Sequence, residues 1–359
     1  MVRNSLRSDR LRATDVLPLV LGRMGGQDGV RALVGNVFRE GGLMRYGVPY
    51  KGSKNQIAEW VVDNLPKAEY FVDLFCGGCA VTHRALISGK YQRFIINDID
   101  GRMPKLFLDA VHGKYTVENH PEWVSREEFH RLKDSDAYVA MIWSFGNNGK
   151  DYIYGADIED MKHAYHNAVY FGDLSGLRQF GYKLSKSDKK SVYGRYLDYQ
   201  RQIKQQVPTA MLEVVSRQVE VERLQSLQSL QSLQSLQSLH GDYAEVKIPE
   251  GAVIYCDPPY ENTLCGKYDG FDSGRFHKWA REQDNIFISE YQMPEDFIVV
   301  AETEKVVLST QFGGSGKVVE RIYTNQRTYD KMDERQKRLI SQNTAVQMTI
   351  EDFLRQGGE

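Results

Sequence analysis

The hydrophobic pattern of residues 71–98 predicts the start of an α/β sheet. Mostly apolar runs at 71–75 and 93–97 have the length and composition of buried strands. Between them, Cys76-Gly77-Gly78-Cys79 predicts a tight turn, and a helix is expected from Ala80. The second run ends at Asp98. The order of strand, glycine turn, helix, strand and acid resembles the first half of a nucleotide-binding sheet. In such sheets the glycines let the backbone approach the ligand, and the acid commonly binds ribose hydroxyls.

A helix is predicted before this unit, from Ser53. Ser53 and Gln56 match the capping-box pattern, in which two side chains satisfy the first backbone N–H groups of a helix. Apolar residues then recur at helical spacing, at Ile57, Trp60, Val61 and Leu65. This helix should lead into the first strand.

A further apolar strand, Val253–Cys256, ends in Asp257-Pro258-Pro259-Tyr260. Ligand sites of open α/β sheets lie at the carboxyl ends of the strands. The Asp257 carboxylate and the Pro258 carbonyl can accept the two hydrogens of an amino group, and two prolines keep that carbonyl aimed. Tyr260 offers a face on which a base can stack. The competing interpretation is a plain turn that ends a strand.

The overall charge of −2 hides a basic segment between residues 178 and 204. Aromatic residues are interleaved with its lysines and arginines, a mixture that suits phosphate neutralisation and stacking on bases. The alternative is a solvated face with a few buried tyrosines. The basic residues are Arg178, Lys183, Lys186, Lys189, Lys190, Arg195, Arg201 and Lys204, and the aromatic ones are Phe180, Tyr182, Tyr193, Tyr196 and Tyr199.

Residues 224–239 repeat Leu-Gln-Ser. A period of three slips by about 60° per repeat on an α-helix, so the leucines would not form the single stripe of a coiled coil. We expect a spacer or a small packed insertion just before a returning strand.

Composition indicates a soluble, cytoplasmic protein. Of the 359 residues, 41% are hydrophobic, and no apolar run approaches the roughly 18 residues of a membrane span. No secretory signal is evident, and four cysteines favour a reducing compartment. Cys76 and Cys79 could form a redox or zinc pair, but Cys256 and Cys265 are too far apart to supply a second close pair. We therefore expect no metal.

The motifs together resemble the Dam-type DNA adenine methylases, in which cofactor motifs precede a target-recognition region and an Asp-Pro-Pro-Tyr motif follows it. Tyr50–Lys54 is similar to the opening cofactor motif of the family, 71–80 to its main cofactor motif, and Gly241–Tyr243 to a segment that contacts the cofactor's adenine. The resemblance covers most of residues 44–325. It implies S-adenosylmethionine as cofactor, bound by Tyr50, Lys54, Asp73, Phe75, Gly77, Gly78, Asp98, Asp242, Tyr243 and Asp257.

The resemblance also implies the fold, a Rossmann-like α/β methyltransferase sheet with an inserted, mostly helical target-recognition region. Residues 1–43, rich in arginine, are expected to be a basic, flexible and dispensable extension, so that Met44 could be the natural start; the alternative is a basic arm that grips DNA. The cofactor-binding half of the catalytic domain is expected at 44–130, the recognition insert with the Leu-Gln-Ser repeats at 131–240, and the catalytic half with the tail at 241–359.

Departures from the family concern the cofactor turn and the recognition segment. Cys79 stands where a third glycine is common. Ser144–Tyr154 loosely resembles the asparagine-glycine recognition segment but lacks the fuller pattern of members that read GATC, so the target sequence stays open. The residues expected to bind DNA are Asn147, Asn148, Lys150, Lys183, Lys186, Lys189, Lys190 and Arg195.

The implied activity is methyl transfer to N6 of adenine in duplex DNA, after the base is flipped out of the helix. Asp257, Pro258, Pro259 and Tyr260 are the expected catalytic residues, and aspartate favours adenine where serine would suggest N4 of cytosine. The expected partner is double-stranded DNA, bound by a monomer or weak dimer in a bacterium or a phage-infected cell. A separately encoded restriction endonuclease is left open as a partner: it cannot be inferred from this chain, which shows no recognisable nuclease motif of its own.

Two other classes remain open. An RNA adenine methyltransferase would share the cofactor and Asp-Pro-Pro-Tyr motifs and use the basic segment for RNA. A catalytically silent DNA-binding protein is disfavoured, because Asp98 and Asp257 are intact.

Overall fold

The computed structural model describes residues 45–204, 212–260, 270–309, 314–334, 336–338 and 340. The extension predicted at 1–43 and Cys265 lie outside the described residues. Among those described, no helix is both long and apolar enough to cross a membrane.

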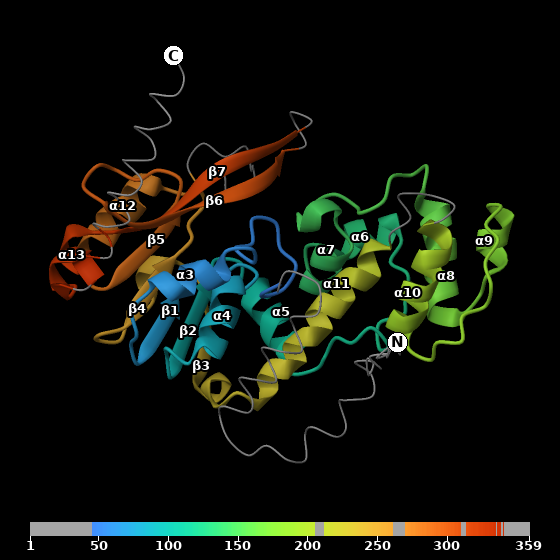
Figure 1. The fold of residues 1–359 in the computed structure, drawn as a ribbon, viewed down its shortest axis with the longest axis horizontal. Coiled ribbons are helices and arrows are strands. Elements are labelled where there is room, and N and C mark those ends of the chain that lie inside the picture. The colour runs from blue at the N-terminus through green and yellow to red at the C-terminus, as the bar shows by residue number, and fades with distance from the viewer. Residues whose placement is uncertain are drawn as a thin grey trace, which may run out of the picture. The chain divides into compact units, whose positions relative to one another are not determined.

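A seven-stranded sheet in the order β3-β2-β1-β4-β5-β7-β6 carries the described fold (Figure 1). The first five strands of this order are parallel, whereas β7 is antiparallel to β5 and to β6. Strands predicted at 71–75, 93–97 and 253–256 are confirmed, and so is the Rossmann-like fold. The strands are β1 Tyr70–Asp73, β2 Arg93–Asp98, β3 Leu236–His240, β4 Val253–Cys256, β5 Ile286–Glu290, β6 Ile298–Ser309 and β7 Gly314–Thr324.

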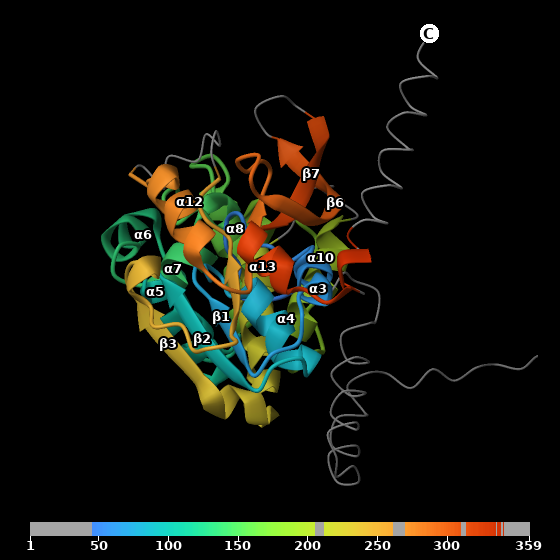
Figure 2. The same ribbon diagram turned by 90° about the vertical axis from the view of Figure 1, so that its left-hand side faces the viewer.

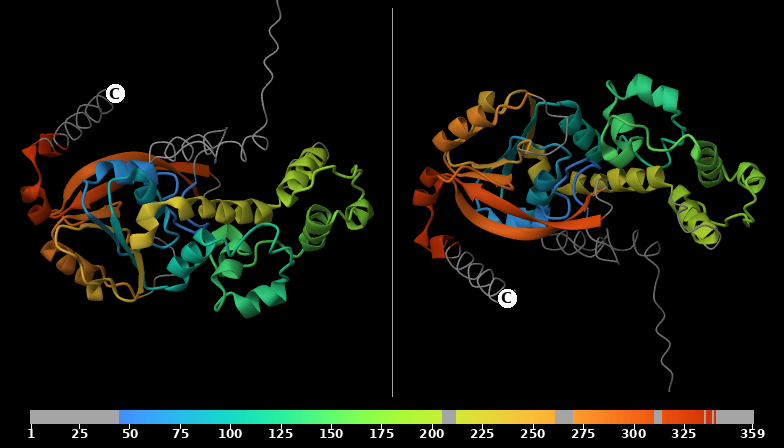
Figure 3. Two further views of the ribbon diagram at one scale, coloured as in Figure 1. Left: turned by 90° about the horizontal axis from the view of Figure 1, so that it is seen from below. Right: turned by 90° about the horizontal axis from the view of Figure 1, so that it is seen from above.

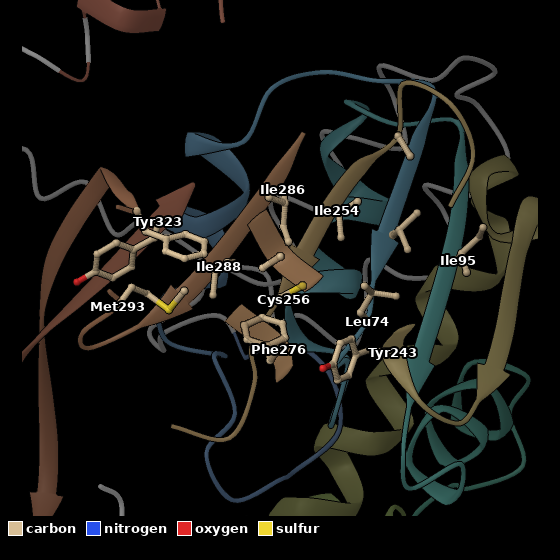
Figure 4. Packing of buried hydrophobic residues seen from close by; sticks show 14 residues of the cluster. Leu74, Ile95, Tyr243, Ile254, Cys256, Phe276, Ile286, Ile288, Met293 and Tyr323 are labelled. Atoms are coloured by element: carbon tan, nitrogen blue, oxygen red, sulfur yellow. The ribbon is translucent and has the colours of Figure 1, made fainter. Parts of the chain in front are cut away.

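Alternate residues of the parallel strands build one side of the core. Val72, Ile254 and Ile288 pack in a buried cluster with Phe276 of helix α12 (Ser273–Glu282) (Figure 4). Helix α4 (Ala80–Ser88), predicted from Ala80, contacts β1 and lies on the other side of the strands from α12 (Figure 2). The remaining elements of this domain are α5 (Arg102–Val111), η5 (Tyr243–Glu245) and α13 (Gln326–Lys331).

The capping box predicted at Ser53 is wrong. Helix α3 covers Ala58–Asn64, and its N-cap Ile57 makes no side-chain cap. The Ser53 hydroxyl instead accepts a 3.3 Å hydrogen bond from the Asn55 N–H. The chain turns before the helix, where the Ser53 N–H bonds the Tyr50 carbonyl, and this turn directs Lys54 into the protein interior.

The segment between β2 and β3 is mostly helical, as predicted. Helix α11 continues into the 3₁₀ helix η3 and lies between the sheet and the outer helices (Figure 3). The helices of this insert are α6 Arg126–Leu132, α7 Ala137–Ile142, η2 Phe145–Asn147, α8 Glu159–Phe171, α9 Ser175–Gln179, α10 Val192–Lys204 and α11 Glu213–Glu222.

The Leu-Gln-Ser repeat forms the 3₁₀ helices η3 (Arg223–Ser229) and η4 (Gln231–Ser235) and then β3 itself. Because a 3₁₀ helix has three residues per turn, a three-residue repeat places its leucines on one side. Leu224 and Leu227 are each 1% exposed. The expected spacer before a returning strand is therefore corrected: the repeat supplies the strand, and residues 236–240 of the predicted insert belong to the sheet.

Candidate active site

The first cofactor motif packs directly on the glycine turn. The Val48 N–H donates a 2.8 Å hydrogen bond to the Gly78 carbonyl. A Cβ added at Gly78 would lie 2.7 Å from Tyr50 Cβ, and one added at Gly77 would lie 3.0 Å from the Tyr50 ring. Both glycines are needed for Tyr50 to lie on the turn, so these three predicted cofactor residues come together.

Asn97 and Asp98 join three strand ends at this edge of the sheet. Asp98 accepts a 2.8 Å hydrogen bond from the Gly77 N–H. The Asn97 amide donates to the carbonyls of Leu74 and Gly241, over 3.2 and 3.0 Å. The segments that follow β1 and β3 therefore meet at the end of β2, where ligands of such sheets bind.

Phe75 and Tyr243 come together as predicted. Their ring centroids are 5.2 Å apart, and Tyr243 also lies beside Phe276 of α12 (Figure 4). Asp242 differs, because its carboxylate forms a 2.6 Å ion pair with Arg275 and accepts a hydrogen bond from the backbone. Its predicted contact with a cofactor stays a prediction.

The residues at this edge fit S-adenosylmethionine. Among the described residues, the buried Asp73 Oδ1 and Tyr243 hydroxyl have no hydrogen-bond partner. The Thr82 hydroxyl donates to the other oxygen of Asp73 over 2.6 Å, and burial raises the pKa of Asp73 to about 7. The cofactor carries an ammonium group, ribose hydroxyls and an adenine ring, and the edge offers carboxylates and aromatic rings that complement them.

The Asp-Pro-Pro-Tyr segment meets the first cofactor motif. The ammonium of Lys54 lies 2.6 Å from Asp257 Oδ1 and 4.5 Å from the centroid of the Tyr260 ring. Pro258 is buried and Pro259 half-buried. Lys54, predicted to bind the cofactor, therefore contacts two of the predicted catalytic residues in this structure.

Two buried acids that the sequence analysis missed complete this arrangement. Glu320 of β7 is fully buried, accepts a hydrogen bond from the Tyr260 hydroxyl and lies 3.4 Å from Lys54. Glu290 ends β5, and burial above all, with a further contribution from Asp257, raises its pKa to about 8. For Glu290 the available signal was an acid at the end of a mostly apolar strand, whereas the polar residues of β7 gave none for Glu320.

The predicted recognition segment forms a loop seated beside the first cofactor motif. Ser144 and Tyr152 form an antiparallel bridge, and the Lys51 N–H donates to the Asn147 carbonyl over 3.2 Å. Arg217 of α11 donates to the Ser144 carbonyl from within the protein over 2.7 Å. Phe145, also missed in the sequence, is 59% exposed on this loop.

The asparagine side chains of the loop stabilise the loop itself. The Asn147 amide donates to the Met141 carbonyl, and Asn148 bonds the Asp151 carboxylate and the N–H of Lys150. Lys150 is exposed. A role in reading bases stays a prediction for all three predicted residues of this loop.

The basic segment divides into an exposed loop and a buried helix face. Between α9 and α10 the loop lysines are exposed, whereas Tyr196 and Tyr199 are buried in the insert. Arg195 donates to the carbonyls of Val169 and Tyr170 and so caps α8. The burial of Tyr196 and Tyr199 fits the alternative, a solvated face with a few buried tyrosines, and DNA contacts of the exposed lysines stay a prediction. The exposed lysines are Lys183, Lys186, Lys189 and Lys190.

The cysteines of the turn are buried free thiols. Burial raises the pKa of Cys76 and of Cys79, which makes both thiols poor nucleophiles. No group of three His, Cys, Asp or Glu side chains among the described residues is arranged to hold a metal ion.

A comparison with protein families assigns the chain to a known class of enzyme. A family model described as D12 class N6 adenine-specific DNA methyltransferase matches residues 50–278, more than half of the 359 residues. No curated protein is similar enough to count as a relative. The matched region contains both cofactor motifs and the Asp-Pro-Pro-Tyr segment, which confirms the activity class predicted from the sequence. The chain belongs to the D12 class of N6 adenine-specific DNA methyltransferases.

Proposed function

We propose that this chain uses S-adenosylmethionine to methylate N6 of adenine at a short sequence in duplex DNA, with the target base flipped out of the helix. The observation that carries the proposal is the position of Asp257, a carboxylate paired with Lys54 at the carboxyl end of β4. The proposed cofactor residues lie at the ends of β1, β2 and β3, the same edge of the sheet.

When bound, S-adenosylmethionine supplies an electrophilic methyl group on a positively charged sulfur. Asp73 provides a buried acceptor for its ammonium group, and Asp98 one for its ribose. Tyr50 on the glycine turn and the Phe75–Tyr243 ring pair offer it apolar surfaces.

The catalytic task of the protein is to make the adenine amino group a nucleophile. The lone pair of N6 is delocalised into the ring until acceptors draw on its hydrogens. Asp257 accepts one hydrogen and the Pro258 carbonyl the other, and the Tyr260 ring stacks on the base. Fixed acceptors of this kind need no rearrangement during the reaction.

Contacts with DNA are proposed for two surfaces. Phe145 presents an exposed ring on a loop that is bonded to Lys51, which suits stacking or wedging at a base beside the site. The exposed lysines between α9 and α10 suit phosphate contacts. A monomer or weak dimer stays a prediction, and a separate endonuclease stays open.

The test is methyl transfer from tritiated S-adenosylmethionine by the full chain, offered unmethylated duplex DNA and folded RNA in competition. The proposal expects label in adenine of the duplex. Label confined to RNA, or none despite cofactor binding, would contradict it.

A further inference from the structure

The ammonium of Lys54 contacts both groups that the proposed function assigns to the target adenine, the Asp257 carboxylate and the Tyr260 ring. The ammonium is bonded to Asp257 Oδ1 at 2.6 Å and lies over the Tyr260 ring at 4.5 Å. The Lys54 side chain is 5% exposed. A base that stacks on this ring face and donates to this oxygen must therefore displace the ammonium. This step of the argument rests on the proposed function.

A second carboxylate lies where the displaced ammonium can go. Glu320 Oε1 is 3.4 Å from Lys54 Nζ and accepts a hydrogen bond from Tyr260. Glu320 Oε2 is buried and has no hydrogen-bond partner among the described residues. Glu320 lies on β7, beyond residue 278, where the family match ends.

We propose that Lys54 exchanges between two carboxylates, pairing with Asp257 before the base arrives and with Glu320 once adenine engages Asp257. Glu320 is then a positioning residue that acts through Lys54. A shift of under about 1 Å is enough to bring the 3.4 Å contact with Glu320 to the roughly 2.8 Å of a charged hydrogen bond, so the second pair forms as the base displaces the ammonium.

The charges favour this exchange over release of the lysine into solvent. An ammonium buried without a partner is strongly unfavourable, and Glu320 removes that penalty when Asp257 accepts from the base instead. Burial alone would lower the pKa of Lys54, but Asp257 and Glu320 raise it above its ordinary value. Lys54 is therefore protonated where it lies between these two carboxylates.

A double-mutant cycle of Glu320→Gln and Lys54→Gln tests the exchange. Glutamine keeps an acceptor for Tyr260 but removes the negative charge. Alone, Glu320→Gln is expected to lower kcat/KM for duplex DNA about 10- to 100-fold, with affinity for S-adenosylmethionine within about threefold. In the Lys54→Gln background, the same change should have less than about threefold effect or restore activity, because no ammonium needs the second site.

If Glu320→Gln lowers kcat/KM equally in the unmodified chain and in the Lys54→Gln variant, the exchange is overturned and Glu320 has only a structural role. Glu302→Gln is the matched control, because Glu302 lies on the neighbouring strand β6 and forms an ion pair with Arg321 of β7. The activity of this variant should be unchanged. If Glu320→Gln does not fold, Glu320→Asp should retain at least about a third of the activity, and its inactivity in a folded protein would contradict the proposal. An unmodified chain that methylates no DNA would overturn the proposed function and the exchange together.

Discussion

The backbone N–H of Lys51 donates a 3.2 Å hydrogen bond to the backbone carbonyl of Asn147. This bond joins the first cofactor motif to the predicted recognition loop, residues 144–154. Arg217 holds the same loop from inside the protein, through the carbonyls of Ile142 and Ser144. A base contacted by the loop would therefore lie close to the segment that carries Lys54.

Phe145→Ala tests the proposed contact of this loop with DNA. Because the ring is exposed, its removal should change the free energy of unfolding by less than about 0.5 kcal/mol. Loss of one stacking contact should weaken DNA binding about tenfold, measured by fluorescence anisotropy. Phe171→Ala, which removes a ring 64% exposed on α8, is the control. Equal DNA affinity in both variants would exclude the contact.

Asp73→Asn is expected to stabilise the protein in the absence of cofactor, and more so at high pH. The folded-state pKa of Asp73 is raised to about 7, so its ionisation opposes folding as the pH rises from about 4 to about 7. Asparagine does not ionise. The variant should therefore gain on the order of 4 kcal/mol over the unmodified chain at pH 8 and almost nothing at pH 4.

Urea denaturation at the two pH values measures this difference. The same substitution should weaken binding of S-adenosylmethionine, because the proposed acceptor of its ammonium loses its charge. A stability gain that is independent of pH would show that Asp73 is not the titrating group.

Leu227→Ala tests the packing of the Leu-Gln-Ser repeat. Leu227 is 1% exposed in η3, so its truncation should cost about 2–4 kcal/mol of unfolding free energy. Leu230→Ala, at the half-buried leucine of the next repeat, should cost about 1 kcal/mol or less. Equal costs in urea denaturation would contradict the deeper burial of Leu227.

The central strands could be predicted because local sequence determines them. Runs such as 71–75, apolar except for Asp73, and 253–256 are typical of a parallel sheet that is covered on both faces, and each leads into one of the predicted motifs. The edge strand β3 could not be found in this way. It consists of residues 236–240 from a polar repeat, and its strand conformation comes from pairing with β2.

The sequence predicted the site residues that belong to recognisable motifs. Tyr50, Gly77 and Asp98 come together because strand order brings the motif ends to one edge. Glu320 was missed because its contacts with Lys54 and Tyr260 depend on the antiparallel pairing of β7, which no local pattern encodes. The capping box at Ser53 failed for a related reason, since a turn before the helix overrides the local preference.

Asp257→Ala addresses catalysis separately from binding. Loss of one fixed acceptor should lower turnover about 10²- to 10³-fold while affinity for S-adenosylmethionine stays within about threefold. Asp296→Ala, at an exposed ion pair with Arg281, is the control and should keep full activity. Equal losses in turnover and cofactor affinity would contradict the assigned role.

The most direct measurement is single-molecule sequencing of unmethylated duplex DNA after incubation with S-adenosylmethionine and either the unmodified chain or Asp257→Ala. The account predicts N6-methyladenine at one short motif with the unmodified chain and almost none with the variant. Methylated cytosine, unmodified DNA, or equal adenine methylation by both proteins would contradict it.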